Sequence, residues 1–370
     1  MRIAISGDGL NAFTSGFPPR GMLSYLVDLR KNDSFEIFYT KSLTNELLAD
    51  YFNELHAKPN VKATFLTGKR TKVIWNRING KANYIDLNGF DIFINPAFLE
   101  YHTRFKGPQI GNVTDLSIIK NQSTLSHPRL RRLLDIRMKR FLLRQSNYNI
   151  VSISEYTHKD ILETFPDIKA QIRVLHNGIA DFWFDESDNV TLSPELDFGL
   201  YFIWWGNVSR RKNITRLVKV FSQMRSQNQS MPRLLIVGSL AEHVKGELIP
   251  LLKNNPHVSQ IPFQSDSIIK SLVKNSQGLI FPSHYEGFGL PVIEAFSQGV
   301  PVACANNTSL PEIAGGHAIL FNENSDEEMA HAILKLWQTG KENTLTLKSY
   351  SKKFKYSSCA QYYNKLINLL

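Results

Sequence analysis

Two carboxylates and two glycines within residues 280–306 are the groups best suited to chemistry in this chain. Glu286 precedes Gly287 and Gly289 in a loop after a short apolar strand, and Glu294 lies about one turn inside the predicted helix that follows. Such a loop exposes backbone N–H groups and the positive end of a helix dipole, which favours an anion such as a diphosphate. The carboxylates can accept hydrogen bonds from sugar hydroxyls. The alternative is an ordinary strand–loop–helix unit whose carboxylates lie in solvent.

A cluster of cations follows another predicted strand, within residues 204–213. The strand ends at Gly206, and Arg210, Arg211 and Lys212 precede the next predicted helix. Two guanidinium groups and an ammonium at the carboxyl end of a strand can hold a diphosphate and neutralise a leaving nucleotide. A basic turn that is merely solvated is the alternative.

Two further candidate segments lie in the N-terminal half. Gly16 and Gly21 flank a loop with two prolines after the first predicted strand, and an irregular surface loop is the alternative there. In residues 110–119, a predicted strand is followed by Thr114 and Asp115. The threonine hydroxyl can hydrogen-bond a sugar, but it cannot act as a base near pH 7.

Short apolar segments alternate with helical patterns along the chain, which predicts an α/β fold. Strands are predicted in the first half at residues 2–6, 35–39, 92–94 and 150–153, and in the second half at 201–205, 234–237, 278–281 and 300–304. Helices of the second half are predicted at 214–224, 268–274 and 291–297. This alternation indicates two mostly parallel, doubly wound sheets with ligands at the carboxyl ends of their strands. The polar, acidic segment 181–197 is the predicted linker.

The spacing of Glu286, seven residues and then Glu294 around GFGLP resembles the signature of the retaining GT-B glycosyltransferases of glycosyltransferase family 4. The following GVPVACANNTSLPEIAG resembles the next strand and loop of that family. Residues 204–213 resemble its phosphate-gripping loop, with Arg211 and Lys212 in the matching places.

The same resemblance shows two departures and one unclear segment. Thr114 stands where many members of the family have histidine, and Asn207 stands where many have arginine. In the base-binding loop, Phe263 fills a place where relatives usually have glycine. The loop at Gly16 resembles the family's glycine-rich loop after the first strand, although prolines replace some of its glycines.

The resemblance implies the GT-B architecture: two Rossmann-like domains that face a cleft, with a C-terminal helix that crosses back to the first domain. Residues 1–180 together with 352–370 would form the acceptor-binding domain. Residues 181–351 would form the donor-binding domain.

The resemblance also implies transfer of a hexose-type sugar, with retention, from a nucleotide-sugar donor to a saccharide or polyprenyl-diphosphate-linked acceptor, without metal or cofactor. The expected setting is bacterial surface polysaccharide synthesis (O-antigen, capsule or lipopolysaccharide). The expected catalytic residues are Glu286, Arg211, Lys212 and Asp115. The expected donor-binding residues are Gly16, Gly206, Asn207, Arg211, Lys212, Phe263, Glu286, Gly287, Phe288, Gly289, Leu290 and Glu294. Among them, Glu286 would bind sugar hydroxyls and Glu294 the nucleotide ribose.

Two other functions are compatible with these residues. One is a nucleotide-sugar epimerase on the same fold. The other is a catalytically silent sugar-nucleotide-binding subunit, which the threonine at position 114 suggests.

Composition indicates a globular protein in a reducing compartment. A hydrophobic content of 42% with 21% charged residues excludes a disordered chain. Cys304 and Cys359 have no metal or redox spacing. The N-terminus is typical of a first strand and not of a signal peptide, and no apolar run approaches the roughly 18 residues of a membrane span. We therefore expect a cytoplasmic protein.

The formal charge of +10 is unevenly distributed. Residues 1–180 hold 25 Lys/Arg against 16 Asp/Glu, whereas residues 181–370 hold 18 against 17. A predicted basic helix from Arg129 to Arg144 carries seven of these cations beside several leucines. We expect it to bind an anionic membrane surface on the inner face of the plasma membrane, with a solvated basic face as the alternative. No nucleic-acid-binding module is recognisable.

Overall fold

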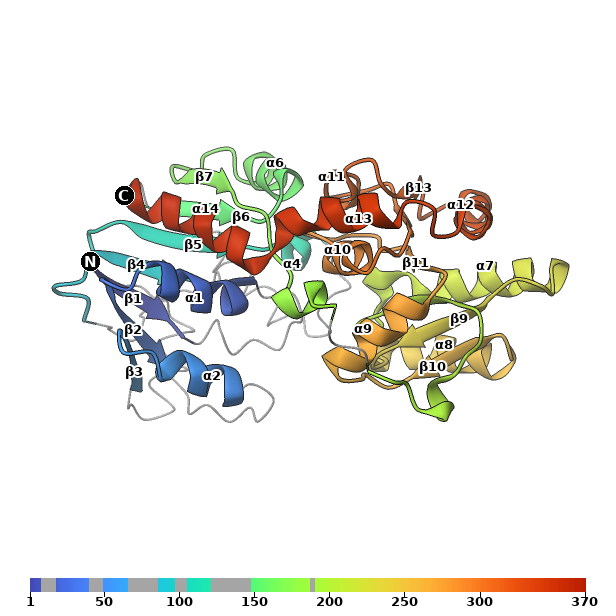
Figure 1. Cartoon of the computed structure of the whole chain (residues 1–370). Coiled ribbons are helices and arrows are strands. Elements are labelled where there is room, and N and C mark those ends of the chain that lie inside the picture. Colours follow the sequence, from blue (N-terminus) through green and yellow to red (C-terminus); the bar gives the residue numbers. More distant parts are fainter. Residues whose placement is uncertain (8–17, 40–48, 66–85, 97–104, 121–147, 187–189) are drawn as a thin grey trace. The chain divides into compact units, whose positions relative to one another are not determined.

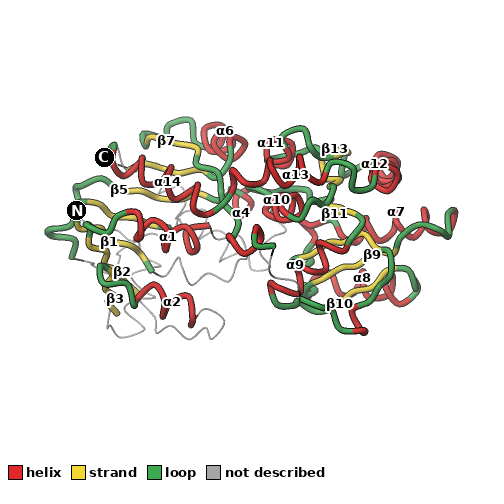
Figure 2. The backbone as a smooth tube through the Cα atoms, viewed as in Figure 1, coloured by secondary structure: helices red, strands yellow, loops and turns green. Residues whose placement is uncertain are grey.

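The structure, a computed structural model of the 370-residue chain, describes all residues except 8–17, 40–48, 66–85, 97–104, 121–147 and 187–189. The chain divides into two compact units. The first unit comprises Met1–Gly178 and Tyr356–Leu370, and the second unit comprises Ile179–Lys355. Each unit has its own parallel sheet (Figure 1 and Figure 2). The predicted α/β class with two doubly wound sheets is therefore confirmed.

The described part of the first unit has a seven-stranded parallel sheet in the order β3-β2-β1-β4-β5-β6-β7. Its strands are β1 (Arg2–Ser6), β2 (Ser34–Tyr39), β3 (Val61–Phe65), β4 (Ile92–Asn95), β5 (Gln109–Val113), β6 (Tyr148–Ser152) and β7 (Gln171–Val174). Its helices are α1 (Pro18–Leu29), α2 (Ala49–His56), α4 (Ser117–Lys120), α6 (Glu155–Thr164) and α14 (Tyr356–Asn368). The central strands are short and fully buried, as expected of parallel strands covered on both faces.

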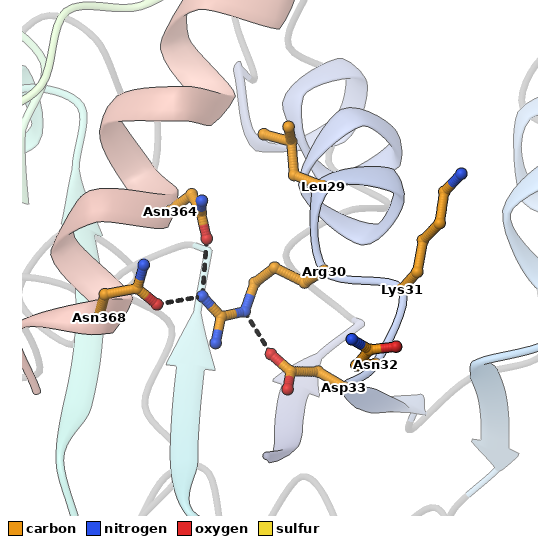
Figure 3. Close-up of a pocket in the computed structure, with 7 residues that line it drawn as sticks. All are labelled: Leu29, Arg30, Lys31, Asn32, Asp33, Asn364 and Asn368. Atoms are coloured by element: carbon orange, nitrogen blue, oxygen red, sulfur yellow. Dashed lines mark hydrogen bonds and ion pairs between the residues drawn. The ribbon is translucent and has the colours of Figure 1, made fainter.

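The C-terminal helix α14 packs on the first unit, as predicted. It lies beside α1 (Figure 1) and adds Cys359, Ala360, Tyr363, Leu366 and Ile367 to the core of that unit. Arg30, just after α1, donates through Nη1 to Asn364 Oδ1 and Asn368 Oδ1, at 2.6 Å each (Figure 3). These residues line a surface pocket of about 230 Å³ that contains none of the predicted site residues. The polar side chains that line this pocket therefore help to hold α14 on the first unit through hydrogen bonds.

In the described residues of the second unit, a six-stranded parallel sheet has the order β10-β9-β8-β11-β12-β13. Its strands are β8 (Tyr201–Trp205), β9 (Arg233–Val237), β10 (Val258–Ile261), β11 (Gly278–Phe281), β12 (Val302–Ala305) and β13 (Ile319–Phe321). Its helices are α7 (Ile214–Gln227), α8 (Glu242–Lys253), α9 (Asp266–Asn275), α10 (Leu290–Ser297), α11 (Leu310–Ala314), α12 (Asp326–Thr339) and α13 (Thr344–Ser351). Short 3₁₀ turns are η2 (Asp181–Phe184), η3 (Pro194–Leu196), η4 (Arg210–Lys212) and η5 (Lys352–Phe354).

The strand order of the second unit reverses between β8 and β11. In open α/β sheets, ligands bind outside the carboxyl ends of the strands at such a switch point. The loops that follow β8 and β11 are residues 206–213 and 282–289, and they carry most of the predicted site residues. The topology thus brings together two segments that lie about 75 residues apart in the sequence.

The predicted linker at residues 181–197 is wrong. Trp183 in this segment is 5% exposed, and its carbonyl oxygen accepts a hydrogen bond from Gln298 Nε2. The buried Lys270 donates through Nζ to the carbonyl oxygens of Phe182, at 2.6 Å, and Asp185. Trp183 and these backbone contacts pack the described residues of the segment against the rest of the second unit, despite its polar and acidic composition.

The unit boundaries also differ from the predicted 180/181 and 351/352. The described chain passes between units after Gly178 and after Lys355. Phe354, in η5, is 2% exposed, and its carbonyl oxygen accepts a hydrogen bond of 2.7 Å from Ile179 N. This contact keeps residues 352–355 in the second unit.

The predicted strand at 300–304 begins at Val302 instead, after Pro301, which has no N–H to pair.

Candidate functional site

Two glycines shape the end of the central strand β8. Gly206 and Gly238 have φ values of +137° and +146°, which L side chains rarely adopt. A Cβ atom added at Gly238 would lie 1.8 Å from the carbonyl oxygen of Gly206. The backbones after β8 and β9 can approach this closely only because Gly238 has no side chain. The chain then continues through the exposed Asn207 toward the cations.

The cations sit in the 3₁₀ turn η4, between β8 and α7. Asn213, at φ +58°, ends this turn in the left-handed conformation and begins α7. The carbonyl oxygen of Arg211 accepts a hydrogen bond of 2.9 Å from His284 N, and Arg211 Nη1 donates to Tyr285 O. The turn after β8 is thereby bound directly to the loop after β11.

Glu286 is the point where the two loops meet. Arg211 Nη1 lies 2.9 Å from Glu286 Oε2, and Lys212 Nζ lies 2.6 Å from Glu286 Oε1. The Glu286 residue is 7% exposed. Burial alone would raise the pKa of this carboxyl, but the charges of Arg211 and Lys212 outweigh it and lower the pKa to about 2. Glu286 is therefore ionised at every physiological pH.

The helix α10 begins at the glycine loop, as predicted. Gly289, at φ +107°, is the residue before the helix, and a Cβ atom there would lie 2.7 Å from Leu310 Cδ2. A helix leaves its first backbone N–H groups without partners inside the helix, so those of Gly289 and Leu290 begin the positive end of α10. Gly287 and Phe288 complete the loop and are buried.

Glu294 presents the second carboxylate from α10. Its Oε2 accepts a hydrogen bond of 3.0 Å from Trp205 Nε1, and the Trp205 ring stacks on Trp183 at 6.4 Å between centroids. Burial raises the pKa of Glu294 to about 8, with a further increase from the charge of Asp266, while the Trp205 hydrogen bond acts in the opposite direction. Glu294 therefore titrates near neutral pH.

The remaining predicted site residues lie elsewhere. Phe263 is 51% exposed on the loop between β10 and α9. Asp115 belongs to the first unit, where its Oδ1 accepts hydrogen bonds from Ser117 N, at 2.8 Å, and from Ser117 Oγ. Those contacts place Asp115 at the start of α4. Gly16 and the basic stretch from Arg129 to Arg144 lie outside the described residues.

Sequence reasoning missed two contributors to this site. Trp205 was predicted only as an apolar strand residue, yet its indole N–H orients Glu294. The turn after β12, residues 307–309, makes several hydrogen bonds to the loop that carries Glu286. The polar residues 307–309, shortly after the strand predicted at 300–304, were the signal that could have indicated this turn.

The described part of the chain contains no group of three or more His, Cys, Asp and Glu side chains placed to hold a metal ion. No helix in that part is both long enough and apolar enough to cross a membrane.

Known proteins resemble the chain in sequence. Residues 194–354 match the model of the family described as glycosyl transferases group 1. The O-antigen chain mannosyltransferase B of Escherichia coli is 26% identical over 225 residues, which cover 57% of this chain and 58% of that protein. The capsular polysaccharide biosynthesis glycosyltransferase CapM of Staphylococcus aureus is 34% identical over 200 residues, 51% of this chain and 52% of that protein. The chain thus spans little more than half the length of these two relatives.

The whole fold also has a solved counterpart. The crystal structure of Anabaena Alr3699/HepE in complex with UDP-glucose superposes with a TM-score of 0.68 at 16% identity, and the match covers 100% of both chains. The fold of two Rossmann-like units is thus the GT-B fold.

Proposed function

We propose that this chain, whose residues 194–354 match the glycosyl transferases group 1 family, transfers a hexose-type sugar from a nucleotide-sugar donor to a saccharide or lipid-linked saccharide. The observation that supports it most is the ion-paired group of Arg211, Lys212 and Glu286 at the switch point of the second sheet. The three charges sum to +1, so a surplus of positive charge faces any anionic ligand there.

The cations fit the negative charge that develops on a departing nucleoside diphosphate. In the free protein Arg211 and Lys212 are held in place by Glu286, and Arg211 also by the carbonyl oxygen of Tyr285, so both cations are oriented before the donor binds. The N–H groups that begin α10 would add hydrogen bonds to phosphate oxygens. These groups supply the stabilisation without a metal ion.

The ionised Glu286 can accept hydrogen bonds but has no proton to donate. We assign it to the hydroxyl groups of the donor sugar. The acceptor hydroxyl would attack C1 from the face that the diphosphate leaves: the new C1–O bond forms as the C1–O(phosphate) bond breaks, and the acceptor proton passes to the leaving phosphate oxygen. This sequence retains the anomeric configuration and needs no separate side-chain base.

Glu294 would bind the ribose of the nucleotide. It lies in α10, after the glycine loop, and Trp205 fixes one of its oxygens at the end of β8. The other oxygen can then accept from ribose hydroxyls. Phe263, exposed after β10, is the candidate surface for the base.

The acceptor belongs to bacterial surface polysaccharide synthesis in this proposal. The supporting observation is that relatives are named for O-antigen and capsular polysaccharide synthesis. A lipid-linked acceptor would place the enzyme on the inner face of the plasma membrane, bound through the basic stretch from Arg129 to Arg144. Co-sedimentation with anionic and neutral liposomes at low and high salt tests that attachment.

The transfer itself is tested with labelled nucleotide sugars. The purified chain is incubated with GDP-mannose or UDP-glucose and a saccharide acceptor, with and without EDTA, and the product is examined by NMR. We expect one donor to give an α-linked product from its α-linked sugar at a rate that EDTA does not change. A β-linked product, or complete loss of transfer with EDTA, would refute the retaining or metal-independent part of the proposal.

A further inference from the structure

We propose that the turn of residues 307–309, after β12, is a clamp that positions Glu286 during sugar transfer, with Thr308 as its key positioning residue. This inference rests on the proposed function, because it concerns the same carboxylate. The turn itself contains no charged group. It follows β12, whereas the two loops of the site follow β8 and β11.

The clamp binds the Glu286 loop by its backbone. Thr308 Oγ1 accepts a hydrogen bond of 3.2 Å from Glu286 N, and the single hydroxyl hydrogen of Ser309 is shared between Glu286 O, 3.0 Å from Oγ, and Phe288 O, 2.8 Å from Oγ. Asn307 Nδ2 donates to Ser283 O at 3.0 Å. The peptide groups on both sides of the Glu286 Cα atom are thereby fixed, which sets the direction in which its side chain leaves the backbone.

Thr308 is held in a conformation that a β-branched residue rarely adopts. Its φ is +50°, in the left-handed region, where glycine or asparagine is usual. Its hydroxyl also donates to Asn307 Oδ1 at 3.1 Å, so one side chain joins the turn to the loop. Strained backbone of this kind persists where the surroundings over-determine it, and it gathers at functional sites.

The clamp matters most when a donor is bound. In the free protein, Arg211 and Lys212 hold both carboxylate oxygens of Glu286. A diphosphate would compete for these cations and weaken both ion pairs. The backbone hydrogen bonds of the clamp would then be what keeps Glu286 aligned with the sugar. Loss of the clamp should therefore lower kcat and leave nucleotide affinity nearly unchanged.

The test compares three substitutions at Thr308 with a matched control. Thr308→Val removes the hydroxyl and keeps the β-branched shape, Thr308→Ser keeps the hydroxyl, and Thr308→Ala serves if the valine variant does not fold. The control is Thr344→Val, since Thr344 Oγ1 donates to the backbone oxygen of Gly299 at 3.0 Å, in the same unit but outside the site. Melting temperature, nucleoside diphosphate affinity and transfer kinetics are measured for each.

We expect Thr308→Val, or Thr308→Ala, to lower kcat by roughly 10-fold to 100-fold with nucleotide affinity within about twofold. Thr308→Ser should recover most of the activity, and Thr344→Val should keep it. If the folded variant without the hydroxyl keeps wild-type kcat, if serine does not rescue it, or if the control loses as much, the clamp has no positioning role.

Glu286→Gln is assayed in parallel. Full activity of that variant would overturn the proposed site together with the clamp, whereas an inactive Glu286→Gln beside a fully active Thr308→Val would overturn the clamp alone.

Discussion

At the scale of single residues, Glu286 and Glu294 illustrate how the environment gives two identical side chains very different pKa values. They lie eight positions apart, yet the pKa of one is about 2 and that of the other about 8. Two cations at hydrogen-bond distance ionise the first. The second is partly buried and accepts from one neutral donor, the indole of Trp205. Such divergent pKa values are typical of functional sites, which supports different roles for the two carboxyls.

Glu286→Gln should abolish most transfer activity while the protein stays folded. Glutamine keeps the shape but loses the charge that holds Arg211 and Lys212 and accepts from the sugar, so we expect kcat to fall by ~100-fold or more. The matched control is Glu247→Gln, on the exposed surface of α8, where Glu247 pairs with Lys219 at 3.0 Å. Steady-state kinetics of both variants decide the matter, and equal activities would remove Glu286 from the reaction.

Nucleotide affinity should depend on pH through Glu294. Its raised pKa means that, in the free protein, its contribution to stability is complete below about pH 4.5 and is lost as pH rises through about 8. Ribose hydroxyls donate to the ionised form, so binding should release a proton near pH 7. We expect affinity for the nucleoside diphosphate to increase about tenfold from pH 7 to pH 9.

Calorimetry in buffers of different ionisation enthalpy measures both the affinity and the released proton. Glu294→Gln should bind more weakly and with a flat profile over this range. A wild-type profile that is also flat would rule out ionised Glu294 as the ribose ligand.

At the scale of elements, the ends of the strands carry the tightest constraints. Gly238 follows β9 at φ +146°, with the carbonyl oxygen of Gly206 where a Cβ atom would lie. We expect Gly238→Ala to destabilise the second unit by roughly 3 kcal/mol or more, since both the backbone and the neighbouring loop must move. Gly246→Ala is the matched control, because Gly246 is exposed in α8 and a Cβ atom added there would meet no other atom within 4 Å.

Gly246→Ala should stabilise the protein by about 0.5–1 kcal/mol, because alanine loses less backbone entropy in a helix. Chemical denaturation gives both free energies of unfolding. If the two substitutions had the same sign and size, the close approach of the loops after β8 and β9 would not be a constraint on the fold.

The elements themselves could largely be predicted, and the site only in part. The apolar run at Tyr201–Trp205 and the proline and glycine that bound α10 are local signals, so those elements were predicted nearly to the residue. Trp183 anchors a segment whose acidic composition suggested a linker, because a few buried contacts outweigh average polarity. The positive φ of Thr308 is imposed by tertiary hydrogen bonds, so nothing in its neighbours could predict it.

At the scale of the whole molecule, the first unit depends on the last residues of the chain. Ile367 is fully buried in its core, whereas Leu369, two residues later, is 72% exposed. Ile367→Ala should destabilise the first unit by about 2–5 kcal/mol, while Leu369→Ala should change stability by no more than about 0.5 kcal/mol.

Differential scanning calorimetry with and without nucleotide shows which unit the Ile367→Ala substitution destabilises. Because the proposed donor site lies in the second unit, Ile367→Ala should still bind nucleotide with wild-type affinity at temperatures where the protein is folded. A loss of affinity parallel to the loss of stability would show that the donor site needs an intact first unit.

The most direct measurement of the central claim, a nucleotide-sugar site built on the second sheet, needs no acceptor. Calorimetric titration of UDP, GDP and their sugar conjugates into the wild type is compared with Lys212→Ala and with Lys219→Ala, an exposed lysine of α7 outside the site. We predict that at least one nucleotide binds the wild type and Lys219→Ala equally, and that Lys212→Ala binds it at least ~10-fold more weakly, as the loss of a charge-assisted hydrogen bond requires. Absence of binding to every nucleotide, or equal affinities of the two lysine variants, would contradict the account.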